Sequence, residues 1–133
     1  MIKQIAVFLE NSAGRAGACC KVLKEANINL HALSIADTKE FGILRIITDD
    51  NAQALSTLKS VGFLSTEVEL VAIEVPNQSG ALSDLLVTLY EAGVSIEYMY
   101  SYAGADGHAK IAFKTGTPEK AENVLKSVGA KVL

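Results

Sequence analysis

The sequence predicts an α+β fold of two βαββαβ units that pack together, each with an antiparallel sheet and helices on one face. Three observations support this prediction. Alternating apolar residues run into an Asn-x-x-Gly turn at 11–14, and the same arrangement recurs 66 positions later at 77–80. Apolar residues follow each turn at helical spacing. Finally, residues 125–129 repeat residues 58–62 letter for letter, which indicates a duplicated unit.

The first repeat begins with an alternating strand at residues 2–9. After the turn comes a helix, and the apolar stripe that we expect to face the core consists of Ala16, Cys19, Cys20 and Leu23. The extended pattern resumes at 28–35 but changes phase near His31, which predicts a β-bulge at that point.

A hairpin and a second helix complete this repeat. Polar residues at 37–40 form the hairpin turn, and 41–48 is its apolar second strand. Asp50 suits the start of a helix that Gly62 ends. Residues 63–66 then supply a short fourth strand.

The second repeat follows the same order, from a strand at 71–75 onward. In its first helix, the stripe that matches the one above consists of Leu82, Leu85, Leu86 and Leu89. Residues 92–96 lead into the next strand, and one residue is inserted in the hairpin loop at 104–107. A last helix and a closing strand follow. These correspondences place the first repeat at 1–67 and the second at 68–133.

Composition and charge exclude several classes of function. The 12 basic and 15 acidic residues give a net charge of −3, without the basic surface that nucleic acids or anionic membranes require. No apolar run approaches the roughly 20 residues that span a bilayer. The two cysteines, Cys19 and Cys20, are adjacent, which excludes long-loop disulfides and fits a reducing compartment. We therefore expect a cytoplasmic protein with no nucleic-acid or membrane partner.

With this topology, residues 77–82 (Asn-Gln-Ser-Gly-Ala-Leu) resemble the Asp-x-Pro-Gly-x-Leu turn of ACT domains, and residues 92–96 resemble their entry into the second strand. The whole chain is thus similar to a tandem ACT-domain protein. The ACT domain is a ferredoxin-like, ligand-sensing fold of amino-acid metabolism. The resemblance implies a non-catalytic regulatory module without a cofactor, which binds a free amino acid, forms a homodimer and can act on a metabolic enzyme.

The resemblance also implies that the ligand binds between the strand-to-helix turn of one domain and the second strand of its neighbour. Carried over by position, the candidate residues are Asn11, Ser12, Gly14, Arg15 and Asn29 in the first repeat and Asn77, Ser79, Gly80, Ala81 and Ser95 in the second. Free N–H groups after Gly14 and Gly80 suit a carboxylate, and an Asn carbonyl can accept from an ammonium group. Tyr98 and Tyr100 are candidates to line the side-chain pocket.

Two alternatives from other classes stay open. Arg15 at a helix start could bind phosphate, as in a small acyl-phosphate or phosphate-ester hydrolase with the same strand order. The chain could instead be a purely structural assembly subunit, in which the turns are only helix caps. His31 and His108 lack local ligand partners, so we expect no metal site.

Overall fold

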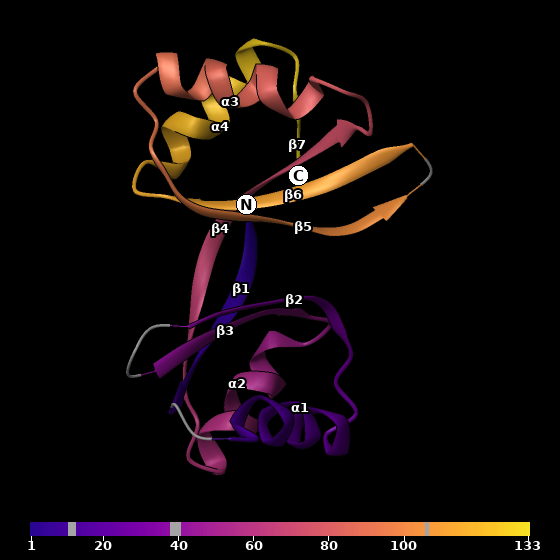
Figure 1. Ribbon diagram of the computed structural model, residues 1–133, viewed down its shortest axis with the longest axis vertical. Coiled ribbons are helices and arrows are strands. Elements are labelled where there is room, and N and C mark those ends of the chain that lie inside the picture. Colours follow the sequence, from indigo (N-terminus) through magenta and orange to yellow (C-terminus); the bar gives the residue numbers. More distant parts are fainter. Residues whose placement is uncertain (11–12, 38–40, 106) are drawn as a thin grey trace. The chain divides into compact units, whose positions relative to one another are not determined.

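Figure 1 shows the computed structural model of the chain, which describes residues 1–10, 13–37, 41–105 and 107–133. The elements follow in the order β1 (Ile2–Glu10), α1 (Arg15–Glu25), β2 (Leu30–Asp37), β3 (Phe41–Thr48), α2 (Asn51–Ser60), β4 (Leu64–Pro76), α3 (Ala81–Glu91), β5 (Ile96–Ala105), β6 (His108–Thr115), α4 (Pro118–Ser127) and β7 (Lys131–Val132). This order confirms the predicted βαββαβ repeats, with β4 shared between them.

The described residues fall into two compact units, and the first consists of Lys3–Val68. Its strand order is β2-β3-β1-β4, and β3 pairs antiparallel with both β1 and β2. α1 and α2 lie on the same side of this sheet (Figure 1). Because side chains alternate along a strand, every second residue of β1 faces the helices. These strand residues form a buried core with residues of both helices, namely Ile5, Val7, Leu9, Cys19, Leu23, Leu44, Ile46, Ala54 and Leu58.

The second unit consists of Glu69–Leu133 together with Met1–Ile2. β4 pairs antiparallel with β6 and β7, and β6 pairs with β5, so the order is β7-β4-β6-β5. α3 and α4 cover one face of this sheet (Figure 1). The core beneath them consists of Val71, Ile73, Val75, Leu89, Val94, Ile111, Phe113, Ala121 and Leu125.

β4 differs from the expectation of two short strands. It runs without a break over 13 residues, of which 64–68 belong to the first unit and 69–76 to the second. The physical reason is the absence of a strand breaker, since the sequence between the two expected strands contains neither Gly nor Pro. The two units are therefore joined by a continuous strand.

The predicted bulge in β2 is confirmed, because the register with β3 shifts between Leu30 and Ala32. The predicted helix stripes need a correction. In α1, Cys19 and Leu23 are buried, but Cys20 is only half-buried. Helical residues one position apart point about 100° away from each other, so adjacent residues cannot both face the sheet squarely.

The same correction applies to α3. Leu89 is its buried residue, and Leu82 and Leu85 are half-buried against the core. Leu86 is also half-buried but, among the described residues, it is not part of that core cluster. The expectation that all four leucines of the stripe face the core was wrong for Leu86.

Candidate functional site

A pocket of about 210 Å³ opens where α1 begins in the first unit. It is formed by the end of β1, the first residues of α1, β3 and β4, and the turn that follows α2. The lining residues are Phe8, Leu9, Glu10, Arg15, Phe41, Gly62 and Leu64. The rings of Phe8 and Phe41 lie 6.2 Å apart between centroids, at an interplanar angle of 54°. The pocket therefore combines an aromatic and aliphatic wall with one cation and one anion.

Arg15 is held in this pocket by a ring rather than by an acid. It follows Gly14, whose φ of 82° is in the left-handed region that favours glycine. The guanidinium carbon of Arg15 lies 4.4 Å from the ring centroid of Phe63, within the range of a cation–π contact. Its Nε atom is buried and has no hydrogen-bond partner among the described residues. The guanidinium is thus fixed in place while a donor remains unused.

The second unit has a pocket of about 420 Å³ at the corresponding place, where α3 begins. Each residue that lines the first pocket has a counterpart in the second. The offset is 66 positions up to the residue inserted in the hairpin loop at 104–107, and 67 positions beyond it. The counterparts are Glu74, Val75, Pro76, Ala81, His108, Gly129 and Lys131. The pocket is therefore a property of the repeat rather than an accident of one copy.

The chemistry of the second pocket is different. Glu74 forms an ion pair with Lys131 of β7. The hydrogen bond from Lys131 holds the pKa of the Glu74 carboxyl below its ordinary value, and the nearby His108 and Lys110 act in the same direction. On β5, which pairs with β6, burial raises the pKa of Tyr102, as does the negative charge of Glu74. Glu74 and Lys131 thus satisfy each other within the protein, whereas the third charged residue of this pocket, Asp84, adds a negative charge.

Of the turn residues predicted to bind the ligand, some lie outside the described residues and the others are exposed. Asn11 and Ser12 lie outside the described residues. Asn77 and Ser79 are exposed, and the N–H of Asn77 donates to the carbonyl of Gly107 at 2.8 Å. The side chain of Asn77 makes no hydrogen bond within the described part of the chain.

Gly80 adopts a φ of 87° at the start of α3, as Gly14 does at the start of α1. The N–H of Ala81 donates to the carbonyl of Gln78 at 3.3 Å. That amide is therefore used inside the turn and is not one of the free N–H groups expected after Gly80. The amides of the next helical residues are the ones that remain for a ligand.

Asn29 and Ser95 lie far from the turn of their own repeat. Each follows the helix that begins at that turn, and an 11-residue helix is about 16 Å long. Tyr98 and Tyr100 are half-buried on β5, opposite Lys114 and Ala112. They are not among the residues that line the pocket at α3.

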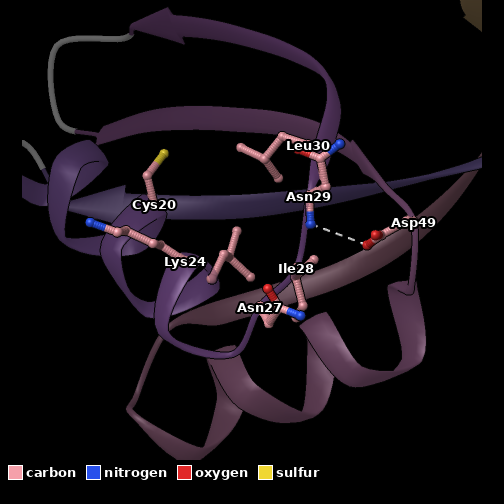
Figure 2. A pocket seen from close by; sticks show the side chains of 8 residues that line it. Cys20, Lys24, Asn27, Ile28, Asn29, Leu30 and Asp49 are labelled. Atoms are coloured by element: carbon pink, nitrogen blue, oxygen red, sulfur yellow. Dashed lines mark hydrogen bonds between the residues drawn. The ribbon is translucent and has the colours of Figure 1, made fainter.

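Asn29 instead lines another pocket of the first unit, at the carboxyl end of α1 (Figure 2). The N–H of Asn29 donates to Oδ1 of Asp49 at 3.2 Å, and the N–H of Asp49 donates back to the carbonyl of Asn29 at 3.2 Å. Cys20 and Lys24 of α1 also line this pocket, whose volume is about 560 Å³. The mutual hydrogen bonds show that Asp49 anchors the segment before β2.

The two cysteines are expected to differ in reactivity. Burial raises the pKa of Cys19 to about 11, so at pH 8 only about one molecule in a thousand carries the thiolate that attacks a disulfide reagent. Cys20 is half-buried and lines the open pocket of Figure 2. We expect the native protein to release one equivalent of chromophore from a dithiobis(nitrobenzoate) reagent, and two after denaturation. Cys20→Ser should abolish the native equivalent, whereas loss of that equivalent in Cys19→Ser would contradict this assignment.

Within the described ranges, no group of three or more His, Cys, Asp or Glu residues is placed to hold a metal ion. In the same part of the chain, no helix is both long and apolar enough to cross a membrane.

The duplicated βαββαβ topology with a pocket at each strand-to-helix turn defines a tandem ferredoxin-like protein. The family model described as ACT domain pair matches residues 1–130, so the chain belongs to the ACT domain pair family. This confirms the family inferred from the turn motif. No curated protein sequence matches the chain.

Solved structures agree with this assignment. Protein BT0572 from Bacteroides thetaiotaomicron is 40% identical, with 99% of this chain and 91% of that chain covered and a TM-score of 0.92. The ligand-free regulatory subunit of aspartate kinase from Thermus thermophilus is 13% identical, with 96% and 91% covered and a TM-score of 0.66. The regulatory subunit of aspartate kinase from Thermus flavus is 16% identical, with 94% and 90% covered and a TM-score of 0.63. At such identities the two kinase subunits share the fold.

Proposed function

We propose that this ACT domain pair is a non-catalytic regulatory module, which binds a free amino acid at a strand-to-helix turn and changes the activity of a metabolic enzyme. The observation that carries the proposal is the recurrence of one pocket at the start of α1 and of α3. A fold that holds a cavity at the same place in both copies has a position suited to a small ligand. The shared fold with regulatory subunits of aspartate kinase supports a role of this kind.

The ligand would contact the turn through Gly14 and Arg15 in the first repeat or through Asn77 and Gly80 in the second. The left-handed glycines lack a side chain, which lets a ligand approach the backbone closely. The exposed amide side chain of Asn77 can accept a hydrogen bond from an ammonium group. Asn29 would face such a turn only from a neighbouring repeat or a second copy.

We further propose that the protein works in the cytoplasm as a homodimer. β2 is an end strand of its sheet, and Leu33 and Ile35 lie across from the core residues Ile46 and Leu44. Leu33 and Ile35 lie on the helix-covered face of the sheet, yet their side chains are 58% and 55% exposed. An apolar strand edge is a template for pairing with another chain, and a second copy would cover it with two-fold symmetry. Sedimentation of the parent and of Leu33→Lys tests this, and a monomeric parent would contradict it.

A thermal-shift screen of the twenty amino acids tests the proposed binding. An amino acid present at about 100 times its dissociation constant should stabilise the native state by about 2.7 kcal/mol. Hits are then titrated by calorimetry. If no amino acid shifts the transition or releases heat, the chain is not an amino-acid sensor. The same preparation is assayed with acetyl phosphate, because turnover that disappears in Arg15→Gln would favour the hydrolase alternative.

A further inference from the structure

We propose that the pocket at the start of α1 binds one apolar α-amino acid per chain, and that the matching pocket at α3 binds none. This inference rests on the proposed function and names the ligand class of its site. Its basis is that corresponding positions of the two pockets carry residues of different chemistry.

The pocket at the start of α1 contains two opposite charges that are not paired with each other. Arg15 and Glu10 line the same pocket, and neither forms an ion pair within the described ranges of the chain. Phe63 holds the guanidinium, and the buried Nε has no hydrogen-bond partner among the described residues. An α-amino acid carries a carboxylate and an ammonium group on neighbouring atoms. It can therefore pair with Arg15 and Glu10 at the same time, which a simple acid or amine cannot do.

The rest of the pocket wall is largely apolar. Phe8, Phe41 and Leu64 are 38%, 39% and 69% exposed, although they are large and apolar. All three line this pocket, where an apolar ligand side chain would cover them. A charged ligand side chain would lose its hydration against this wall without gaining a partner. The volume of about 210 Å³ is below the range of about 300–1,000 Å³ for drug-sized ligands, which fits a single amino acid.

The matching pocket at the start of α3 lacks this pair of charges. The positions of Glu10 and Arg15 are taken there by Pro76 and Ala81, so both charges that would hold an amino acid are missing. Of the charged residues that do line this pocket, Asp84 would repel a ligand carboxylate, and Glu74 and Lys131 are paired with each other. A ligand carboxylate would have to break that pair to gain a partner. The pocket at α1 thus has the two charged groups that would hold a zwitterion, and the pocket at α3 does not.

The test is calorimetric titration of the full chain with leucine, phenylalanine, aspartate and lysine. Two leucine analogues, 4-methylpentanoate and leucinamide, each lack one of the two charges. We expect one site per chain that takes leucine or phenylalanine and excludes aspartate and lysine. Each analogue should bind more weakly than leucine, because one of the two protein charges then lacks a partner.

Variants assign the site. Arg15→Gln should weaken binding about 10- to 100-fold, the range for a hydrogen bond to a charged group. Glu10→Gln should weaken it about 2- to 5-fold, because Glu10 is exposed and its charge is screened. Lys21→Gln, on the exposed side of α1, is the control and should bind as the parent does. Lys131→Gln changes the second pocket and should also leave the affinity unchanged.

The outcomes separate two failures. If no amino acid binds the parent, the proposed function falls and this inference falls with it. If an amino acid binds at two sites, prefers a charged side chain, or loses affinity in Lys131→Gln but not in Glu10→Gln, only this inference is wrong. Circular dichroism confirms folding of each variant. Should Arg15→Gln fail to fold, Glu10→Gln and the two analogues still decide the question.

Discussion

Replacing Phe113 by alanine is expected to lower the free energy of unfolding of the second unit by about 3–5 kcal/mol. Phe113 lies on β6, is 1% exposed and belongs to the core beneath α3 and α4. Truncation removes a ring from a close-packed environment, so it loses both the burial of apolar surface and the contacts of the neighbours with the ring.

Denaturant unfolding followed by tyrosine fluorescence measures this change. The chain has no tryptophan, and its four tyrosines all belong to the second unit, so this signal reports that unit. Tyr90→Ala is the matched control, because Tyr90 is 82% exposed and its loss should change stability by no more than about 0.5 kcal/mol. A loss at Tyr90 as large as that at Phe113 would show that α3 packs differently from this description.

Replacing Leu89 by alanine is expected to cost about 2–5 kcal/mol, and replacing Leu86 clearly less. Both residues belong to the apolar stripe read from the sequence, yet only Leu89 is fully buried in the core. Leu86 is half-buried, so truncation there removes fewer contacts and leaves no closed cavity.

The comparison uses the same chemical change three positions apart on one helix, which keeps the difference in helix propensity constant. Urea unfolding by circular dichroism at 222 nm gives both free energies. Equal losses at the two positions would mean that Leu86 is covered in solution. Cover by another copy of the chain would depend on protein concentration, so repeating the experiment at several concentrations would reveal it.

The α+β class, the duplication and the family could be predicted because they rest on local signals. Turn glycines, the change of apolar period from strand to helix, and the offset of 66 are all properties of short segments. Gly14 and Gly80 adopt the left-handed conformation that glycine favours at such turns. The phase change near His31 likewise corresponds to the bulge in β2.

The continuous β4 and the register of the helices could not be predicted in this way. How far a strand extends depends on the strands beside it, and β4 has partners along its length in two units. A helical stripe read from spacing is broad enough to include Cys19 and Cys20 together. Only packing against the sheet buries the first of these and leaves the second lining a pocket.

The candidate site also combines residues that the sequence indicated with residues that only the structure brought to it. The sequence by itself drew attention to the turn and to Arg15, because a glycine turn before a helix has a recognisable local pattern. It did not indicate Phe8, Glu10 or Phe41 as partners of Arg15. Glu10 and Phe41 are 31 positions apart and meet only because β1 and β3 pair in the register that sets them opposite each other. Strand pairing brings distant residues to one sheet end through backbone hydrogen bonds, which carry no local sequence signature, so only the tertiary structure decided the composition of the pocket.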